Sequence, residues 1–516
     1  MTTTTLRDDR TTSATRPTEP AAKPWDAAAV AVLATAVSAA GAARPSLWFD
    51  EAATISAASR PVGELWRMAA NIDAVHGLYY LLMHGWLTVF PATEFGCRLS
   101  SAVAVGIAAA GVVVLGRQLS TRAVGLAAGA LFAFLPRVTW AGAETRPYAL
   151  TMAAAVWLTV FCVGVTRRGS SWWWLVYAPL VSAAAMLNVF LVVMVPVHAV
   201  VVLTLAERRG VFRWCAMAAG AGLASVVPFL WFAQRQLFQV QWISPLGTQT
   251  ATEVVGVQYF DHAWPFAVLA GVMICCGLLC LGQVDEVTGE HPGRLVTVTV
   301  IWIALPTGVL VLYSALLHPV YYPRYLSFTA PALALLLGLC VVALGRSRPA
   351  ITAIVVLFAV AAVPNYLAQR GPYAKEQMDY SQVADVIGRH AAPGDCLVLD
   401  NSAAWKPGPI RPLTAVRPEA YGKLRDYGRG LTAIQRNRLW DSHIAVWAWA
   451  DRMPGCPALW TVTERDPTRP ERESGPELPP GQRLGRAMAY QVPSRFGFRV
   501  VERWQFSFAQ VTKSVR

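Results

Sequence analysis

The chain has 516 residues, of which 55% are hydrophobic and only 15% are charged. Soluble globular proteins are nearer a quarter charged, so this composition excludes an ordinary soluble domain and indicates a polytopic membrane protein. The formal net charge of +13 would suit a nucleic-acid partner. Much of the basic excess, however, lies in short loops between apolar runs, where it is typical of a topology signal. We therefore predict no nucleic-acid binding.

The first 24 residues are rich in Thr, Ala, Pro and charge, and they precede the first apolar run. We predict that residues 1–24 form a disordered cytoplasmic tail. A signal peptide carries its basic residues directly before a short apolar core and a cleavage site. This segment is too long and too polar for that pattern, so we expect the first apolar run to remain as a membrane span.

Apolar runs long enough to cross a bilayer, about 17 to 25 residues, recur along residues 25–367, the predicted transmembrane module. The expected fold is mostly α-helical, with about 11 transmembrane helices. We place them near Asp26–Ala43, Leu99–Gly116, Ala123–Thr139, Pro147–Thr166, Trp172–Leu187, Val189–Ala206, Trp214–Phe232, Trp264–Gly282, Leu295–Leu317, Tyr325–Leu344 and Pro349–Leu367.

The distribution of arginines sets the expected orientation. With the N-terminus in the cytoplasm, the inner loops carry ten arginines and the short outer loops carry four, Arg137, Arg146, Arg235 and Arg324. Basic residues favour cytoplasmic loops. The odd number of spans then puts residues 368–516 outside. We predict a multi-pass protein of the plasma (inner) membrane with an extracytoplasmic active site and C-terminal domain.

The first outer loop, residues 44–98, is large and partly apolar. Its segments Val62–Ile72 and His76–Phe90 mix Trp, Tyr and His with Leu, which is typical of interfacial helices. The alternative is that His76–Phe90 forms a twelfth span. That alternative would reverse the parity and put the arginine-rich loops outside, against the positive-inside rule.

Polar groups that are costly near a membrane gather at the expected outer ends of the spans. Two acidic residues follow the first span, and an acidic residue and an arginine lie between the third and fourth spans. An asparagine lies between the fifth and sixth spans, and a segment of polar and aromatic residues lies between the ninth and tenth. These residues are Asp50 and Glu51; Glu144 and Arg146; Asn188; and His318, Tyr321, Tyr322, Arg324 and Tyr325.

Each of these groups also has a simpler explanation. Asp50 and Glu51 could end a span in solvent, and Glu144 could pair locally with Arg146. Arg324 could extend to the headgroups, and the tyrosines could anchor the chain at the interface. Because the acidic and cationic groups all fall on one face, their convergence favours a shared functional cavity.

These residue types suit transfer of a group from a lipid phosphate. A carboxylate can deprotonate an acceptor hydroxyl as a general base. A cation can bind a phosphate leaving group and stabilise the charge that develops on it. Arginine is well shaped for this, because its planar guanidinium binds phosphate through two parallel hydrogen bonds.

Five segments occur in an order that resembles a known family. They are "LWFDEAATIS", "HGLYYLLMHGWL", "TEFGCRLSSAVAV", "AETRPYAL" and "YYPRYLSFTAPALALLLG". The ordered set resembles the polyprenyl-phosphate-sugar-dependent glycosyltransferases of the GT-C superfamily, akin to protein O-mannosyltransferases and aminoarabinose lipid A transferases. The resemblance covers roughly residues 26–367. The Ala- and Arg-rich composition also resembles that of actinobacterial proteins.

The resemblance implies inverting transfer of a sugar from a polyprenyl-phosphate donor on the outer face. The expected acceptor is a glycan, a lipoglycan or a protein. Mannose is the favoured sugar, with arabinofuranose second if the source is actinobacterial.

The resemblance also implies roles for single residues. Asp50 matches the catalytic aspartate and would be the general base, and Glu51 would orient the acceptor or a metal. Arg324 matches the arginine expected near the donor phosphate, with Tyr325 beside it. The other predicted substrate-binding residues are His76, Glu144, Arg146, Tyr148, Asn188 and Tyr322.

A metal site is a separate question. His76, His84, His318, Asp50 and Glu51 could supply ligands, but their spacing is not that of a dedicated site. We predict no obligatory cofactor and leave open a loosely bound divalent cation.

The C-terminal segment, residues 368–516, reads as a small α/β domain. We expect a helix over Tyr380–His390 and strands over Cys396–Asp400, His443–Ala450, Ala458–Glu464 and Phe498–Lys513, with a mobile loop over Asp466–Gln482. No glycine-rich phosphate loop accompanies the first strand, so a nucleotide site is not expected. Trp405, Trp447 and Trp449 could stack on sugar rings, although tryptophans in strands more often pack in a core.

Two of the nine cysteines, Cys396 and Cys456, lie in this segment. An oxidising exterior permits them to pair, so we predict a Cys396–Cys456 disulfide. The alternative is two unrelated buried thiols.

Two other classes of function remain open on the sequence alone. A polytopic transporter or lipid-linked-sugar flippase would also use many spans and a polar cavity. The sequence shows no internal repeat of the kind that transporters often have. A non-catalytic assembly subunit whose outer domain recruits enzymes is the third hypothesis.

Overall fold

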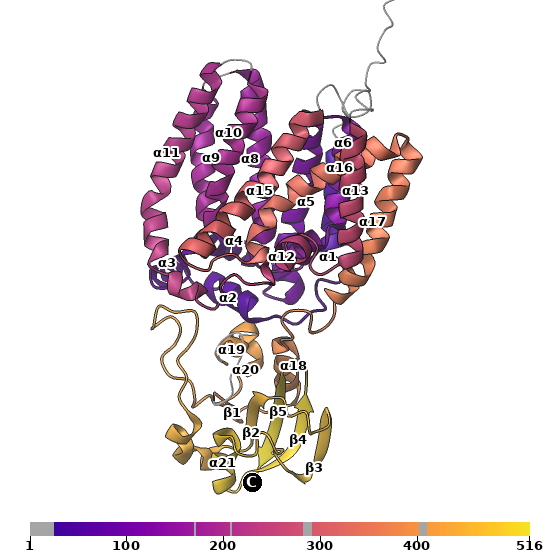
Figure 1. Cartoon of the computed structure of the whole chain (residues 1–516). Coiled ribbons are helices and arrows are strands. Elements are labelled where there is room, and N and C mark those ends of the chain that lie inside the picture. Colours follow the sequence, from indigo (N-terminus) through magenta and orange to yellow (C-terminus); the bar gives the residue numbers. More distant parts are fainter. Residues whose placement is uncertain (1–24, 170–171, 207–208, 282–291, 402–409) are drawn as a thin grey trace, which may run out of the picture.

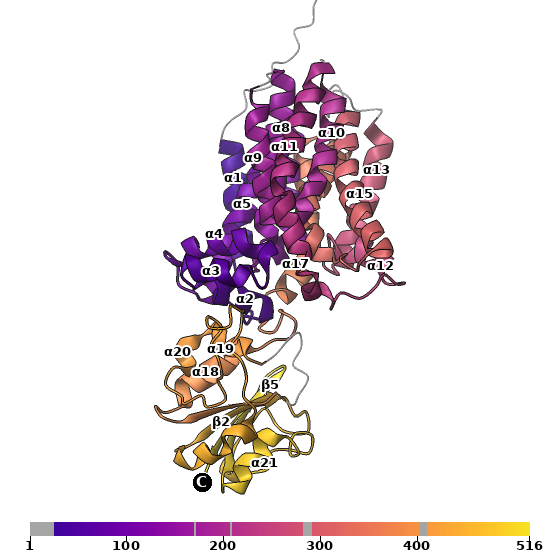
Figure 2. The same cartoon turned by 90° about the vertical axis from the view of Figure 1, so that its left-hand side faces the viewer.

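The computed structural model describes residues 25–169, 172–206, 209–281, 292–401 and 410–516. A bundle of helices forms the larger part, and a domain built on a five-stranded sheet lies at one end of the bundle (Figure 1, Figure 2). Two predictions, for the N-terminal tail and for Trp405, fall outside the described residues.

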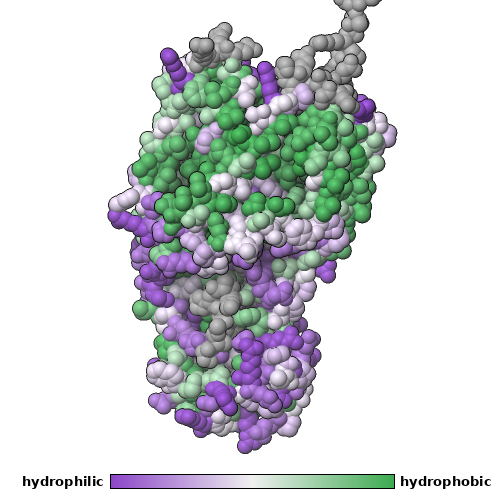
Figure 3. All heavy atoms as spheres, in the orientation of Figure 1, coloured by the Kyte–Doolittle hydropathy of each residue, from purple (hydrophilic) through white to green (hydrophobic). Residues whose placement is uncertain are grey.

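Six helices in the described part are long and apolar enough to cross a membrane, and the bent pair α6 (Arg122–Phe134) and α7 (Pro136–Gly142) would make a seventh. The six are α5 (Glu94–Leu119), α8 (Tyr148–Arg168), α11 (Arg209–Gln234), α15 (Pro292–Leu316), η6 with α16 (Pro323–Thr329 and Ala330–Gly345) and α17 (Arg348–Ala368). Apolar side chains cover this part of the surface, and polar ones dominate around the sheet domain (Figure 3). The expectation of a mostly helical, multi-pass membrane protein is confirmed.

Four shorter apolar helices occupy the remaining predicted spans. They are α1 (Trp25–Ala39), α9 (Trp174–Leu187), η2 with α10 (Val189–Val193 and Met194–Leu205) and α13 (Trp264–Cys280). Each has fewer than 18 residues, which is near the lower limit for a full crossing. The count of eleven spans therefore stays a prediction.

One predicted span is not a straight helix. The run Ala123–Thr139 is divided between α6 and α7, which meet at an angle of 61°. Leu135 is extended (φ −61°, ψ 125°), and Pro136 begins α7. Proline restricts the residue before it to extended backbone and cannot donate to the preceding turn, so the helix breaks at this point.

Glycines allow the central helices to approach closely. A Cβ atom on Gly116 of α5 would lie 2.6 Å from Cα of Gly125 in α6, and one on Gly338 of α16 would lie 2.7 Å from the backbone of Ala128. Small residues at such contacts are how helices pack in a membrane, where the hydrophobic effect does not drive them together.

Short helices of the first loop lie at the end of the bundle that faces the sheet domain (Figure 1, Figure 2). They are α2 (Phe49–Ala58), α3 (Val62–Ala69), η1 (Ala74–His76) and α4 (Gly77–Leu87). With 11 residues, α4 is too short to cross a bilayer. This supports the interfacial interpretation of His76–Phe90 over a twelfth span.

The remaining short helices of the bundle follow α11. They are η3 (Leu237–Val240), α12 (Thr250–Thr252) and η4 (Glu253–Val257).

The C-terminal domain contains a mixed sheet with strand order β1-β2-β5-β4-β3. Among its described strands, β1 and β2 pair in parallel and the other neighbours pair antiparallel. The strands are β1 (Cys396–Leu399), β2 (Leu459–Glu464), β3 (Arg472–Leu478), β4 (Arg499–Gln505) and β5 (Ala509–Val515). The helices are α18 (Tyr380–His390), α19 (Pro412–Val416), α20 (Pro418–Tyr421), η7 (Val446–Gly455) and α21 (Met488–Arg495). The expected small α/β domain is therefore present, and α18 has the predicted bounds.

Three sequence predictions in this domain are wrong. The expected strand over His443–Ala450 falls largely in η7, where Trp449 is buried and Trp447 is 64% exposed. The expected single strand Phe498–Lys513 is the hairpin β4–β5. The expected loop Asp466–Gln482 contains the edge strand β3. The side chains of β3 are polar and mostly exposed, so they show no apolar alternation. Its Gly475–Pro476 pair lies at a shift in the register with β4.

The sheet domain is attached to the bundle by specific contacts. Two hydrogen bonds of 3.0 Å join the chain before α2 to the start of α18. Ser381 N donates to Ser46 Oγ, and Leu47 N donates to Ser381 Oγ. Leu47 and Trp48 also share a hydrophobic cluster with α18 and the sheet. Within the domain, Cys396 and Cys456 form a disulfide, linking β1 to the end of η7.

Candidate active site

The first turn of α2 holds the predicted catalytic aspartate. Asp50 Oδ2 lies 3.2 Å from Nη2 of Arg324, in an ion pair between side chains that are 17% and 9% exposed. Arg324 comes from η6, far along the chain. The two predicted residues that matter most for the chemistry are therefore in contact.

Aromatic rings enclose the Arg324 guanidinium. Its Cζ atom lies 4.8 Å from the ring centroid of Tyr322, 5.4 Å from that of Trp48 and 5.7 Å from that of Trp242. Cation–π attraction of this kind holds a guanidinium in place without using all its hydrogen-bond donors. Its Nε is buried and has no partner among the described residues, so Arg324 can still donate to a ligand.

A second arginine lies beside Asp50. Arg146 Nη1 lies 3.2 Å from the Tyr80 hydroxyl and 3.5 Å from the carbonyl oxygen of Asp50, and Nη2 lies 3.1 Å from Nε2 of His76. Its Nε is also buried without a partner in the described chain. Two guanidinium groups with unused donors therefore contact Asp50, Arg324 at its carboxylate and Arg146 at its backbone carbonyl.

Asp73 supports Arg146 from behind. Because arginine can only donate, Nε2 of His76 accepts from Arg146, and Nδ1–H of His76 donates to Asp73 Oδ1 at 2.7 Å. Tyr80 also donates to Asp73. Burial alone would raise the pKa of Asp73, but the neighbouring His76 and Arg146 hold that pKa well below its usual value. Asp73 itself has a left-handed φ of 64°, an unusual conformation for a residue other than glycine.

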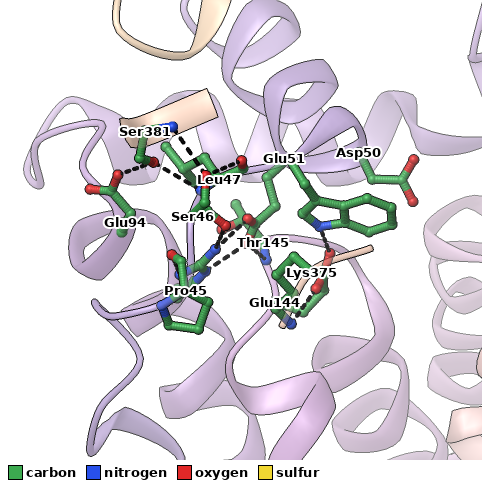
Figure 4. A network of polar contacts seen from close by, with 12 residues as sticks. Pro45, Ser46, Leu47, Asp50, Glu51, Glu94, Glu144, Thr145, Lys375 and Ser381 are labelled. Atoms are coloured by element: carbon green, nitrogen blue, oxygen red, sulfur yellow. Dashed lines mark hydrogen bonds and ion pairs between the residues drawn. The ribbon is translucent and has the colours of Figure 1, made fainter. Parts of the chain in front are cut away.

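Glu51 lies in a different environment from Asp50. Its carboxylate and the guanidinium of Arg98 are both fully buried and joined by two hydrogen bonds of 2.8 and 2.6 Å. Arg98 also donates to the carbonyl oxygens of Ala42, Pro45 and Ser46. Figure 4 shows Asp50 pointing away from this network. The expected role of Glu51 in orienting the acceptor or a metal does not fit a carboxylate closed off from substrate.

Glu144 is also fully paired. It accepts a hydrogen bond of 2.7 Å from Nε1 of Trp48 and forms a 2.5 Å ion pair with Lys375 (Figure 4). Glu144 and Lys375 are both buried. Glu144 therefore positions Trp48, whose ring contacts Arg324, and does not face a ligand as predicted.

The remaining predicted residues lie around this centre or support it. Tyr148, the first residue of α8, is buried close to Arg324. Tyr325 stacks on Phe190 and lies 5.8 Å from Tyr322 between ring centroids. Asn188 caps η2 by accepting a hydrogen bond from the backbone of Phe190, which is a structural role.

The donor set for a metal is limited. No group of three or more His, Cys, Asp and Glu side chains that could hold a metal ion occurs in the described part of the chain. His76 is engaged with Asp73 and Arg146, and His318 is exposed. A loosely bound divalent cation stays a prediction, and we derive no step through one.

Sequence reasoning missed several residues of the site. Asp73, Tyr80, Arg98, Trp242 and Lys375 each contact a predicted residue. Arg98 carried the one available signal, because a charged residue at the edge of an apolar run is costly without a partner. Nothing in the sequence indicates which partner it would have.

Two comparisons with solved structures address the fold. The structure matches the crystal structure of ArnT from Cupriavidus metallidurans in the apo state with a TM-score of 0.58, over 94% of this chain and 97% of that one, at 13% identity. The same protein bound to undecaprenyl phosphate matches with a TM-score of 0.56 at 12% identity over the same shares. The chain has the GT-C fold. The resemblance to GT-C glycosyltransferases that the sequence indicated is thereby confirmed.

A family comparison covers part of this GT-C chain. Residues 76–232 match the family described as dolichyl-phosphate-mannose-protein mannosyltransferase. That range includes His76, Glu144, Arg146, Tyr148 and Asn188, and it ends before Arg324. A search of curated proteins found no significant match.

Proposed function

We propose that the protein is an inverting glycosyltransferase that takes a sugar from a polyprenyl-phosphate donor at the outer face of the plasma membrane. The observation that carries this proposal is the contact between Asp50 and Arg324 in a partly open site. Mannose is the favoured sugar and arabinofuranose the second. The acceptor is a hydroxyl of a glycan, a lipoglycan or a protein.

The residues of the site supply the two functions that such a transfer needs. Asp50 accepts the proton of the acceptor hydroxyl as that oxygen attacks the anomeric carbon. The bond between the anomeric carbon and the phosphate oxygen breaks, and polyprenyl phosphate leaves. Arg324 stabilises the negative charge that the phosphate gains.

The charges around Asp50 agree with a phosphate ligand. Arg324 contacts the carboxylate of Asp50 and Arg146 its backbone carbonyl, and the buried Nε atom of each lacks a partner among the described residues. A phosphate can accept several hydrogen bonds from guanidinium groups. The crystal structure of ArnT with undecaprenyl phosphate, a protein of the same fold, supports a polyprenyl phosphate as the ligand class.

The location of the site also favours an enzyme over a transporter. Asp50 lies in the first-loop helix α2, at the end of the bundle that faces the sheet domain (Figure 2). Transport sites lie near the middle of the membrane, where broken helices meet.

Replacing Asp50 with Asn tests the proposal. Asp50→Asn removes the base and keeps the size of the side chain, so we expect sugar transfer to fall by about 10²- to 10⁴-fold. Binding of polyprenyl phosphate should change by only a few-fold. The assay measures polyprenyl phosphate released from a panel of polyprenyl-phosphate sugars.

The matched control is Asp451→Asn, at an exposed position of the sheet domain. It should transfer sugar at the wild-type rate. Wild-type transfer by the Asp50→Asn variant would rule out the proposed base. A wild-type protein that releases no polyprenyl phosphate from any donor would contradict the function itself.

A further inference from the structure

A cavity with a volume of about 300 Å³ lies where α2 meets the sheet domain. Ser56 of α2 and Ser59, which directly follows α2, line it on the membrane side. Thr414 and Ala415 of α19, together with Trp440, line it on the domain side. The cavity is therefore formed jointly by the bundle and the C-terminal domain.

The two arginines that line this cavity are each paired with a carboxylate. Two arginines, Arg411 and Arg429, and two acids, Glu419 and Asp441, contribute to the lining. Arg429 Nε lies 2.6 Å from Asp441, and Arg411 is bound through two hydrogen bonds to Asp426. An anionic ligand would have to displace a carboxylate from its arginine. A neutral ligand would leave both ion pairs intact.

The other lining groups suit a polyhydroxylated ligand. Ser59 presents a hydroxyl group that can donate and accept, and the Thr414 hydroxyl, which donates to the carbonyl oxygen of Arg411, can still accept. Trp440 presents an aromatic ring, a surface on which the apolar face of a sugar can lie. A cavity with a few polar groups against an aromatic wall is typical of small-molecule sites.

The cavity is close to the candidate active site but separate from it. The ring of Trp440 lies 5.5 Å from that of Phe49, the residue before Asp50. Ser59 follows Asp50 by nine residues, which on a helix is about 13 Å along the axis and half a turn to the opposite side. A ligand in the cavity would therefore not occupy the space between Asp50 and Arg324.

We propose that this cavity binds a neutral sugar unit of the acceptor, remote from the hydroxyl that Asp50 deprotonates. The inference rests on the proposed function and narrows the acceptor class to a glycan of several sugar units. A single sugar at Asp50 would not reach the cavity, whereas a longer glycan that passes Phe49 and Trp440 would.

Filling the cavity tests the inference. Full-length protein in detergent is titrated with neutral trisaccharides, mannotriose among them, and binding is measured by saturation-transfer NMR without any donor. We expect wild-type protein to bind at least one trisaccharide at millimolar concentration. Ala415→Trp, which places a large ring inside the cavity, should weaken that binding by about tenfold or more.

A matched control carries the same substitution elsewhere in the domain. Ala392→Trp lies at an exposed position outside the cavity and should bind as the wild type does. Ser59→Trp fills the cavity from the α2 side and should repeat the loss, so the result does not depend on the folding of one variant. Unfolding temperatures identify any variant that has not folded.

The outcomes separate this inference from the proposed function. Asp50→Asn should bind the trisaccharide as the wild type does, because the cavity does not include that residue. Failure of every trisaccharide to bind, or equal binding by wild type and both filled variants, would overturn the inference and leave sugar transfer at Asp50 unaffected. If the protein binds a trisaccharide but transfers no sugar, the inference about the cavity stands and the proposed enzymatic function is contradicted.

Discussion

Asp50 and Glu51 are neighbours in the first turn of α2, yet successive side chains of a helix point about 100° apart. Asp50 therefore points toward Arg324 and remains partly open, while Glu51 enters a fully buried contact with Arg98. A buried ion pair is costly to break, because the remaining charge stays without a partner. The adjacent acids thus divide into a partly open residue, for which we propose the chemistry, and a buried one that pairs with Arg98.

A substitution at Glu51 separates structure from chemistry. Glu51→Gln leaves the buried Arg98 charge without a counter-charge, so we expect the free energy of unfolding to fall by about 3 to 5 kcal/mol. Thermal unfolding in detergent measures the change. Asp50→Asn, at a more open position, should shift the unfolding temperature much less. A Glu51→Gln variant that is as stable as the wild type but inactive would give Glu51 a catalytic role.

The segment between α17 and α18 connects the bundle to the sheet domain. It carries Lys375, which pairs with Glu144, and it ends at Asp379, which accepts hydrogen bonds of 2.7 and 2.8 Å from the backbone of Phe508 and Ala509. Burial raises the pKa of Asp379 from 3.8 to about 6, despite those hydrogen bonds. This short connecting segment therefore contacts both the candidate active site, through Lys375, and the start of β5, through Asp379.

This shift predicts how the stability of the domain depends on pH. The folded state binds the proton of Asp379 more tightly than the unfolded state, so the contribution to stability is present below pH 4 and is lost as pH rises through about 6. The shift of about two units corresponds to about 3 kcal/mol. Asp379→Asn mimics the protonated form, so we expect it to raise the unfolding temperature at pH 7.5 and not at pH 4.

The control for this prediction is Glu471→Gln, whose side chain is 82% exposed. It should leave the pH dependence of unfolding as in the wild type. An Asp379→Asn variant that is destabilised more at pH 7.5 than at pH 4 would indicate that the carboxylate is the favoured form.

At the scale of the whole molecule, the first loop and the sheet domain lie at the same end of the bundle (Figure 1). Hydrogen bonds from Ser381 N to Ser46 and from Leu47 N to Ser381, with the shared cluster around Trp48, attach them to each other. Whichever side of the membrane one of them faces, the other must face it too. The arginine distribution predicts that this side is the exterior.

Cysteine labelling of intact cells tests this orientation. Ala70→Cys, at an exposed position after α3, should react with a membrane-impermeant maleimide without permeabilisation. Ser347→Cys, between α16 and α17 at the opposite end, should react only after permeabilisation. The wild-type protein gives the background from its free cysteines. The reverse pattern would place Asp50 in the cytosol and contradict a reaction at the outer face.

Some features of this protein follow from local sequence. Apolar runs of sufficient length give spans, and arginine counts give an expected orientation, because both depend on the solvent that surrounds one segment. The helix α18 was predictable for a similar reason, since its apolar positions follow a helical period. The edge strand β3 was not, because its mostly exposed side chains carry no alternation and only its pairing with β4 makes it a strand.

The roles of the polar residues were decided only by the tertiary structure. The sequence placed Asp50, Glu51, Glu144, Arg146 and Arg324 at one end of the spans, but a charge near a membrane is stabilised by whichever partner the packing brings to it. That partner was Arg324 for Asp50, Arg98 for Glu51 and Lys375 for Glu144. These pairs join segments that are distant in the chain. Composition and spacing therefore determined a membrane protein with polar span ends, and packing determined which of those polar groups stay partly open and which are buried in pairs.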